Sequence, residues 1–443
     1  MNLNLTGIYE DINEAIRVSK EAQKTVREMS LEQREKIISK IRENIFKYAE
    51  ELSALAVEET GMGRIDHKIF KHKLVAKGTP GTEDIKAEII SGDKGLTILH
   101  KSAFGVIGAI TPCTNPSCTI LHNSIAMIAG GNTIVFNPHP NAVRVSNRAV
   151  EIVNISSVEA GGPENIVTSV TNPTIESGNV LMRHPDISLL VVTGGPGVVT
   201  AALCSGKRAI GAGAGNPPVV VDGTADIAKA AIDIVDGCTF DNNLPCIAEK
   251  EIVVVKEVAD ELIYYMVENG CYMINEEQVE RLTRLVLLEK NGRAFLNRDF
   301  VGKDAVRILE AIDVEASESV RCIIFRAGRE HPLVVQELMM PVLGIVEVKD
   351  IDEAVLVAKE LEHGNRHSAH IHSKNIDNLN KYEKEMDTAI LVKNAPSYSV
   401  LGVGGEGFVT FTIASRTGEG LTSAKTFTKN RQSVLSRSVL KTN

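Results

Sequence analysis

Apolar residues recur at helical spacing in the segment that follows Ser30. The stretch from Ser30 to Gln33 reads Ser-Leu-Glu-Gln, in which a hydroxyl and a side-chain amide three residues apart form a capping box, the signature of a helix start. We therefore expect a long helix that runs to about Thr60 and ends at Gly61. Its apolar face is supplied by residues spaced three, four or seven apart: Ile37, Ile38, Ile41, Ile45, Leu52 and Leu55.

A different rhythm begins near Gly105. Short apolar, β-branched runs alternate with segments of helical spacing, at residues 133–136, 165–170, 188–193 and 218–222. The pattern continues with a helix at 224–237, a strand at 251–255, a helix at 352–363 and strands near 368–372 and 389–392. Strands that alternate with helices predict an α/β fold with parallel sheets. We find no internal repeat and no Pro-, Gly- or Ser-rich linker that would mark a domain boundary.

Composition narrows the class of protein. A chain of 443 residues with 43% hydrophobic and 24% charged residues is too long for one core and predicts two or three globular domains. The formal charge of −9 argues against a nucleic-acid partner, and no apolar run approaches the roughly 18 residues that span a membrane. The seven cysteines lack metal-ligand spacing, which favours a reducing compartment over a disulfide framework.

Cys246 is the strongest candidate nucleophile. It follows the turn-forming residues Asp241-Asn-Asn and a proline, and it precedes the strand expected at 251–255. A cysteine in a loop that enters a sheet can be partly exposed and can meet a substrate. Taken alone, however, a single cysteine is more often a small buried apolar residue.

Three motifs carry a family resemblance. Residues 242–249, residues 211–218 (Gly-Ala-Gly-Ala-Gly-Asn-Pro-Pro) and residues 337–341 (Glu-Leu-Met-Met-Pro) resemble the CoA-acylating aldehyde dehydrogenases. The resemblance is strongest to the propionaldehyde, acetaldehyde and butyraldehyde dehydrogenases of bacterial microcompartments, and it runs from about Gly7 to the C-terminus. It implies an α/β, aldehyde-dehydrogenase-like fold with three parts. These are a Rossmann-type NAD-binding domain (1–95 and 109–221), a catalytic domain (222–420) and a small β oligomerisation flap (96–108 and 421–443).

The resemblance also implies the reaction. A short-chain (C2–C4) aldehyde would be oxidised reversibly to acyl-CoA with NAD+, through a thioester on Cys246. Hydrolytic relatives carry a glutamate that activates water, but residues 209–218 hold no carboxylate. Because general-base help contributes about 10²–10⁴-fold, its absence leaves the acyl group for a better nucleophile, such as the thiol of CoA. The stretch also fits a plain glycine-rich turn between two strands.

Asn115 is the candidate oxyanion partner. It stands in a Pro-bounded turn just past the apolar run that starts at Gly105, where α/β proteins place ligand-binding groups. It matches the family asparagine that, together with the backbone N–H of the nucleophilic cysteine, holds the developing alkoxide. An asparagine in a turn is otherwise most often a turn residue.

Cofactor residues are expected because the oxidised carbon must lose a hydride, which no side chain accepts. Val191–Gly197 follows a strand and opens a helix, so its exposed amides could face a pyrophosphate, although a simple turn explains the same residues. The resemblance adds Glu337 as a ligand of the nicotinamide ribose and leaves the choice between NAD and NADP open. The full predicted set is Thr111, Pro112, Asn137, His139, Thr193, Gly194, Gly195, Gly213 and Glu337.

Four histidines near the C-terminal end, His363, His367, His370 and His372, invite a metal site. Residues 363 and 367 have helical spacing, but Gly364-Asn-Arg interrupts them, and 370 and 372 alternate as in a strand. The segment resembles a His-Ser-Ala-x-Ile-His-Ser motif of the acylating family that carries no metal. We therefore predict no metal.

Two alternatives stay open at this stage. One is a hydrolytic aldehyde dehydrogenase, which releases a carboxylic acid and draws its base from Glu249 or Asp241. The other is a non-catalytic relative that serves as a structural subunit. The sequence also does not show how the Cys246 thiolate forms, because no His or Lys is adjacent to it.

The expected partners are the aldehyde, CoA and further copies of the chain. Leu96–His100 and Lys425–Val434 match the segments that relatives use as an intersubunit flap, which predicts a homo-dimer or homo-tetramer. An alcohol dehydrogenase is a candidate partner, and neither nucleic acid nor a membrane is expected. Met1–Thr6 is too short for the amphipathic helix that directs relatives into microcompartments, so we expect a cytoplasmic enzyme.

Overall fold

The computed structural model describes residues 7–290 and 293–436. The chain divides into two compact units. Unit 1 is assembled from three stretches, Met1–Glu59, Ile69–Ala212 and Phe408–Asn443, whereas unit 2 comprises Thr60–Lys68 and the continuous stretch Gly213–Gly407. Each unit is built around its own parallel sheet.

The sheet of unit 1 has six parallel strands. Their spatial order is β1 (Ile8–Tyr9), β6 (Val167–Val170), β5 (Thr133–Asn137), β4 (Val106–Ile110), β7 (Ile187–Thr193) and β8 (Ala209–Ala212). From β4 the chain proceeds outward through β5 and β6 on one side and then through β7 and β8 on the other. The strand order therefore reverses beside β4, and ligands of open α/β sheets bind at such a reversal.

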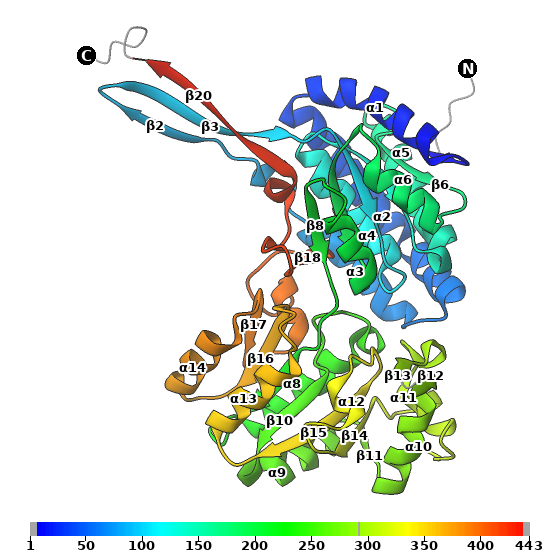
Figure 1. The fold of residues 1–443 in the computed structure, drawn as a ribbon, viewed down its shortest axis with the longest axis vertical. Coiled ribbons are helices and arrows are strands. Elements are labelled where there is room, and N and C mark those ends of the chain that lie inside the picture. Colours follow the sequence, from blue (N-terminus) through cyan, green and yellow to red (C-terminus); the bar gives the residue numbers. More distant parts are fainter. Residues whose placement is uncertain (1–6, 291–292, 437–443) are drawn as a thin grey trace. The chain divides into compact units, whose positions relative to one another are not determined.

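Helices cover both faces of this sheet, as the apolar pattern requires (Figure 1). One face packs against α1 (Ile12–Glu28), α6 (Ile175–Arg183) and α7 (Pro196–Leu203). The other packs against α2 (Leu31–Thr60), α3 (Ile65–Gly78), α4 (Pro116–Ala129) and α5 (Val143–Glu159). The remaining short elements are η1 (Thr82–Asp84), η2 (Pro140–Ala142), β18 (Ile413–Ala414), β19 (Gly420–Leu421) and η6 (Ala424–Phe427).

The predicted N-terminal helix is confirmed. The Gln33 N–H donates to the Ser30 hydroxyl at 3.2 Å, and the Gln33 side-chain oxygen accepts the Ser30 N–H at 2.8 Å, so the capping box is formed. Gly61 follows the helix with φ +66°, the left-handed conformation that suits a glycine at a helix end.

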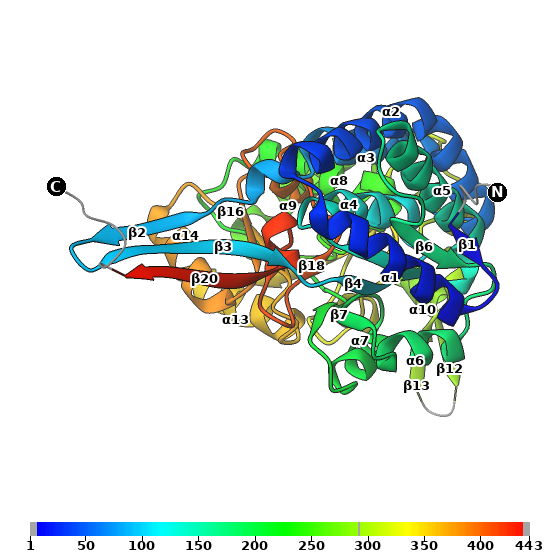
Figure 2. The same cartoon turned by 90° about the horizontal axis from the view of Figure 1, so that it is seen from above.

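A three-stranded antiparallel sheet, here called the flap, projects from the rest of unit 1 (Figures 1 and 2). It consists of β2 (Glu88–Gly92), β3 (Gly95–Ala103) and β20 (Thr428–Ser436), with β3 in the middle. In the structure the segment at 96–100 lies within β3 and pairs with the C-terminal strand β20. Three details differ from the expected ranges: β2 adds a strand before residue 95, β4 already begins at Val106, and Lys425 lies in η6 ahead of β20.

Unit 2 contains seven parallel strands. Their order is β11 (Cys271–Met273), β14 (Cys322–Arg326), β15 (Val342–Val348), β10 (Glu251–Val255), β9 (Pro218–Val221), β16 (Ser368–His372) and β17 (Ile390–Lys393). Alternate residues of β10 face two different cores. One core includes α8 (Ile227–Thr239) and α9 (Lys256–Glu268), and the other includes α13 (Ile351–Leu361) and α14 (Ile376–Met386).

Short elements complete unit 2. They are η3 (Phe240–Asn243), α10 (Glu276–Val286), the hairpin of β12 (Leu287–Lys290) and β13 (Arg293–Leu296), η4 (Arg298–Phe300), α11 (Ala305–Glu310), α12 (Pro332–Val335) and η5 (Ser397–Leu401).

The predicted alternation of strands and helices is confirmed in both units, with one correction. Residues 209–212 form strand β8 and not part of a glycine-rich turn, because Ile210 is buried and Ala209–Ala212 pair in parallel with β7. Among the helices of residues 7–290 and 293–436, none is both long and apolar enough to cross a bilayer. Met1–Thr6, on which the expectation about packaging rests, lies outside the described residues.

Candidate active site

The predicted residues of unit 2 gather at one edge of its sheet. Cys246 lies in the loop that enters β10, Gly213 in the loop that enters β9, Glu337 in the loop that enters β15, and His367 directly precedes β16. Strands β15, β10, β9 and β16 are neighbours in that order and run parallel. All four loops therefore meet at the amino end of adjacent strands.

The loop that carries Cys246 is preceded by an unusual turn. Asp241, Asn242 and Asn243 have φ values of 48°, 54° and 65°, so three consecutive residues other than glycine adopt the left-handed conformation. Asp and Asn tolerate this conformation better than other side chains, because their short polar groups can form local hydrogen bonds. The Asp-Asn-Asn sequence thus permits a backbone path that most residues would strain.

Buried side-chain contacts hold this turn in place. The Asp241 carboxylate accepts the Arg64 N–H at 2.8 Å and forms an ion pair with the ammonium of Lys68 at 3.1 Å. The Asn242 amide donates to the Gly302 carbonyl at 3.0 Å. Because Asp241, Asn242 and Lys68 are buried, rearrangement of the turn would leave polar groups unpaired.

Asn243 and Lys250 close the two ends of the Cys246 loop. The Asn243 amide donates to the carbonyls of Cys238 at 3.0 Å and Glu249 at 2.8 Å. The Lys250 ammonium donates to the Asn243 carbonyl at 2.9 Å and to the Asn243 side-chain oxygen at 2.5 Å. Hydrogen bonds therefore join Asn243, at the start of the loop, to Glu249 and Lys250, at its end.

Cys246 itself is half-buried in this loop. Burial and, to a smaller extent, the nearby Glu337 carboxylate raise the pKa of its thiol to about 12, against the lowering effect of the Lys250 ammonium. At neutral pH the thiol is therefore protonated in the free enzyme. The sequence showed no His or Lys adjacent to Cys246, and the fold supplies Lys250 from four positions along the chain.

Gly215 lies at the centre of the predicted group. A Cβ atom on this residue would lie 3.0 Å from Cγ of His367 and 3.1 Å from the Cys246 carbonyl oxygen, so a larger residue would displace one of them. Its N–H donates to the Glu337 carboxylate, whose pKa is raised chiefly by burial. The carboxylate-free glycine stretch therefore lies directly beside the candidate nucleophile.

His367 is a residue whose position the sequence did not reveal. Burial lowers the pKa of its imidazole to about 4, so the ring is neutral at neutral pH. Nδ1 lies 2.9 Å from the Ser368 hydroxyl, and Nε2 has no hydrogen-bond partner within the part of the chain that the structure describes. A neutral nitrogen base thus lies at the same edge as Cys246.

Neither alternative base is placed to activate water. Glu249 is buried, it accepts the Ser397 N–H at 2.9 Å, and burial raises its pKa to about 8, so its carboxyl group is protonated at neutral pH. Asp241 is engaged by Lys68 and Arg64 in the turn described above. The structure therefore gives no support to the hydrolytic alternative through these two residues.

Asn115 belongs to unit 1, where it is the N-cap residue of α4. The Lys71 ammonium, which is buried, donates to the Asn115 side-chain oxygen. Because an ammonium group can only donate, this contact fixes which end of the amide is the oxygen. The amide N–H₂ is therefore the end that can donate to an oxyanion.

Most predicted cofactor residues of unit 1 lie at the carboxyl edge of its sheet. Thr111 follows β4, Asn137 ends β5, Thr193 ends β7, and Gly195 is the N-cap of α7. The Thr111 hydroxyl is buried and has no hydrogen-bond partner among the described residues, and a Cβ on Gly195 would enter open space. These features fit a dinucleotide at the reversal of strand order beside β4.

Three other predicted cofactor residues of unit 1, Asn137, His139 and Gly194, contact groups of the protein itself. The Asn137 side-chain oxygen accepts the Ser177 hydroxyl at 2.6 Å, and Nδ1 of His139 accepts the Asn141 N–H at 3.1 Å, so both side chains have structural partners. Gly194 is close to Val198, which a Cβ would approach to 2.9 Å. Pro112 directly follows Thr111. The cofactor roles of these residues stay predictions.

The histidines of the segment at 363–372 contact different groups. Nε2 of His363 lies 2.7 Å from the Val335 carbonyl, and Nε2 of His370 lies 2.9 Å from the Ile247 carbonyl. His372 is buried beside Asp233, at 3.9 Å. Residues 7–290 and 293–436 contain no group of three or more His, Cys, Asp or Glu side chains arranged to hold a metal ion.

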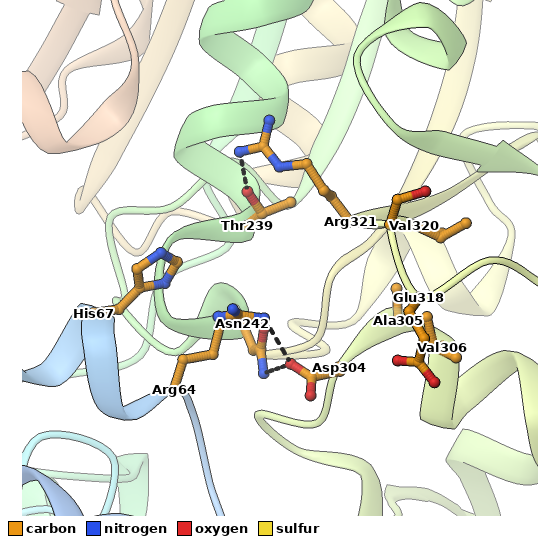
Figure 3. Close-up of a pocket in the computed structure, with 11 residues that line it drawn as sticks. Arg64, His67, Thr239, Asn242, Asp304, Ala305, Val306, Glu318, Val320 and Arg321 are labelled. Atoms are coloured by element: carbon orange, nitrogen blue, oxygen red, sulfur yellow. Dashed lines mark hydrogen bonds and ion pairs between the residues drawn. The ribbon is translucent and has the colours of Figure 1, made fainter.

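A separate polar cavity of about 260 Å³ opens in unit 2, and Asn242 of the left-handed turn is among the residues that line it (Figure 3). Arg64 and the Asn242 amide both reach Asp304, at 3.4 and 2.9 Å, and Arg321 donates to the Thr239 hydroxyl at 3.0 Å. These polar side chains of the cavity wall therefore form hydrogen bonds and ion pairs with one another. None of the predicted catalytic or cofactor residues is among the described residues that line the cavity.

Comparisons with known proteins show which family the chain belongs to. Residues 6–408 match the family described as the aldehyde dehydrogenase family. The acetylating acetaldehyde dehydrogenase EutE of Salmonella typhimurium is 45% identical over 97% of this chain and 92% of its own.

Two solved structures are close in fold. A propionaldehyde dehydrogenase from the fucose utilisation microcompartment of Clostridium phytofermentans has a TM-score of 0.96 and 62% identity, over 97% of this chain and 98% of its own. The Rhodopseudomonas palustris propionaldehyde dehydrogenase, solved with bound CoA and an acylated cysteine, has a TM-score of 0.95 and 48% identity, over 98% of both chains.

Proposed function

The chain belongs to the aldehyde dehydrogenase family, and from that membership we propose that it is a CoA-acylating enzyme. It oxidises a short-chain aldehyde with NAD+ and CoA to acyl-CoA, NADH and a proton, and it runs in both directions. The observation that carries this function is the glycine stretch beside Cys246, which brings no carboxylate to the place where hydrolytic relatives have their base.

The first chemical step belongs to Cys246. Its thiolate adds to the aldehyde carbon, a carbon–sulfur bond forms, and the carbonyl π electrons move to oxygen as an alkoxide. The Asn115 amide and the Cys246 N–H are the donors assigned to that oxygen. Donors fixed before reaction stabilise the developing charge without reorganisation.

The cofactor, when bound, supplies the acceptor for the hydride that leaves the substrate carbon. The unit 1 residues that would hold it are Thr111 and the Gly194–Gly195 turn at the edge of that sheet. The family resemblance assigns Glu337 to the ribose hydroxyls. The unpartnered Thr111 hydroxyl and the open space at Gly195 fit such a ligand. Collapse of the alkoxide leaves a thioester on Cys246.

Acyl transfer completes the cycle. The CoA thiol sulfur attacks the thioester carbonyl, the carbon–sulfur bond to Cys246 breaks, and the thiolate is restored. His367 is the group assigned to accept the CoA thiol proton, because it is neutral at neutral pH and its Nε2 has no partner among the described residues. Water lacks comparable help in the same stretch.

The test is the dependence of NADH formation on CoA, measured with ethanal, propanal and butanal. With CoA, we expect steady turnover and acyl-CoA as product. Without CoA, we expect a single burst of NADH followed by slow leakage. Full steady-state turnover without CoA, with carboxylic acid accumulating, would contradict the proposal and favour hydrolysis.

We further propose that the flap joins copies of the chain into a dimer or tetramer. Ile89, Ile90 and Val434 on the flap are 65%, 60% and 66% exposed, which is a large apolar surface for an isolated three-stranded sheet. Light scattering should give a mass above one chain, and replacement of both Ile89 and Val434 with aspartate should lower it. A monomer before substitution would contradict this assignment.

The chemistry also favours a cytoplasmic setting with an alcohol dehydrogenase as partner. All seven cysteines are free thiols, which suits a reducing compartment. An alcohol dehydrogenase that reduces a second aldehyde with NADH would regenerate the NAD+ that this reaction consumes. Coupled turnover at limiting NAD+ would test the partnership.

A further inference from the structure

We propose that Lys250 is a positioning residue for Cys246, whose buried ammonium both fixes the left-handed turn before the nucleophile and places a positive charge toward the thiolate. The proposal rests on the proposed function, because it assumes that Cys246 acts as a thiolate. In the sequence, only the place of Lys250 four positions after Cys246 points to this residue.

The contacts of Lys250 support the first part. Its side chain is 2% exposed, and its ammonium donates to both oxygens of Asn243 and lies 3.9 Å from the Glu337 carboxylate. A buried ammonium is costly unless such partners surround it, so its presence indicates a specific requirement at this site.

The backbone conformation supports the same part. Asn243 has a φ of 65°, and the carbonyl group that Lys250 binds belongs to this left-handed residue. The Asn243 amide in turn holds the carbonyls of Cys238 and Glu249. Removal of the ammonium would therefore release the start of the loop whose middle carries Cys246.

Charge supports the second part. The Lys250 ammonium lies 3.9 Å from the Glu337 carboxylate, that carboxylate accepts the Gly215 N–H, and a Cβ on Gly215 would lie 3.1 Å from the Cys246 carbonyl oxygen. Burial lowers the pKa of Lys250, whereas the nearby carboxyls of Glu337 and Glu251 and the thiols of Cys238 and Cys246 raise it. The ammonium in turn disfavours protonation of His367. For Cys246 the two charges oppose each other, since Lys250 favours the thiolate and Glu337 disfavours it. Ionisation of Cys246 releases its proton to solvent and leaves the electron pair on sulfur.

The experiment measures how fast iodoacetamide alkylates Cys246 in the full-length protein. Mass spectrometry of the peptide that carries Cys246 separates it from the other six thiols, across about pH 6 to about pH 10. Lys250→Met keeps a long apolar chain and removes the charge, so it should raise the pKa of Cys246 and slow alkylation by about tenfold or more at a fixed pH. Lys250→Arg should retain part of the wild-type rate. Lys349→Met, at a surface lysine that is 74% exposed in its side chain, is the matched control and should change nothing.

A second variant should shift the pKa and the alkylation rate of Cys246 in the opposite direction. Glu337→Gln removes the negative charge, so it should lower the pKa of Cys246 and speed alkylation at the same pH. A folded Lys250→Met protein in which Cys246 is alkylated at the wild-type rate at each pH would overturn the proposal. If Lys250→Met does not fold, an unchanged or slower reaction of Glu337→Gln overturns it and a faster one supports it. Because alkylation needs neither aldehyde nor CoA, these outcomes are independent of the CoA-dependence test.

Discussion

The two parallel sheets of this protein use opposite edges for their candidate ligands. In unit 1, Thr111, Thr193 and Gly195 lie at the carboxyl ends of strands or just beyond them. In unit 2, Cys246 and Glu337 lie in loops that lead into the amino ends. The same α/β architecture thus presents a different set of loops in each half of the chain.

The edge of unit 1 suits cofactor binding, whereas the edge of unit 2 suits covalent chemistry. The carboxyl edge of unit 1 offers helix N-termini and small residues, which suit the close approach of a phosphate. The amino edge of unit 2 offers a loop held from both ends by Asn243 and Lys250, which suits a nucleophile that must keep its position. If this division is right, substitutions at the two edges should affect different measurements.

The largest effect is expected from Cys246→Ala. The substitution removes the nucleophile and leaves the cofactor edge of unit 1 unchanged, so turnover should fall by at least about 10³-fold while NADH binding is retained. Steady-state NADH formation and NADH fluorescence titration measure the two properties separately. Cys204→Ala, at an exposed cysteine, is the control. Loss of NADH binding together with turnover would break the division.

Asn115→Ala tests a unit 1 residue with a proposed chemical role. Loss of one oxyanion donor should lower kcat by about 10²–10³-fold and leave the dissociation constant of NADH nearly unchanged. The comparison is sharpened by Lys71→Met, which frees the orientation of the Asn115 amide and should give a smaller loss of kcat. An effect of Asn115→Ala on KM alone would assign this residue to substrate binding instead.

Asn243 tests the strained turn of unit 2. Asn243→Ala removes two buried hydrogen bonds to backbone carbonyls and the side-chain oxygen that accepts from Lys250. It also places alanine at φ 65°, so it should destabilise the fold by about 2–4 kcal/mol. Asn243→Gly loses the same hydrogen bonds but adopts the conformation freely, so it should be about 1 kcal/mol more stable than the alanine variant. Thermal unfolding of the three proteins measures the order. An alanine variant as stable as the glycine variant would show that the turn relaxes.

The smallest effect is expected at the cofactor edge. Gly195→Ala adds a methyl group in open space, so the fold should be unaffected, yet the dissociation constant of NAD+ should rise several-fold, by about 1 kcal/mol. Gly92→Ala on the flap is the control, since a Cβ there also meets nothing. Unchanged NAD+ affinity of Gly195→Ala would remove the Gly194–Gly195 turn from the binding site.

The fold and the nucleophile could be predicted because their signals are local. A capping box at Ser30 and apolar runs such as 251–255 report helices and strands directly. Cys246 could be singled out by its loop and by the resemblance of the residues around it. Residues 209–212 were missed as a strand because the glycines and alanines that allow close packing there also resemble a turn.

The partners of the site could not be predicted from the sequence alone. His367 reaches the Cys246 loop only because β16 packs beside β9, and Lys71 reaches Asn115 across 44 positions of sequence. Lys250 is near in sequence, but its contact with Asn243 depends on a left-handed turn that no spacing rule reports. These are long-range or conformational facts, and single-sequence patterns carry neither.

The stretches of sequence that make up each unit determine which unit can be completed first during synthesis. Nearly all of unit 2 is the continuous stretch Gly213–Gly407, whereas unit 1 needs Phe408–Asn443 to complete it, and β20 pairs with β3 across more than 300 positions. A ribosome delivers residues from the N-terminus onward, and contacts between distant positions form late because loop closure costs entropy. We therefore expect unit 2, which carries Cys246, to fold while the chain is still being synthesised. Unit 1 can be completed only after β20 has been made.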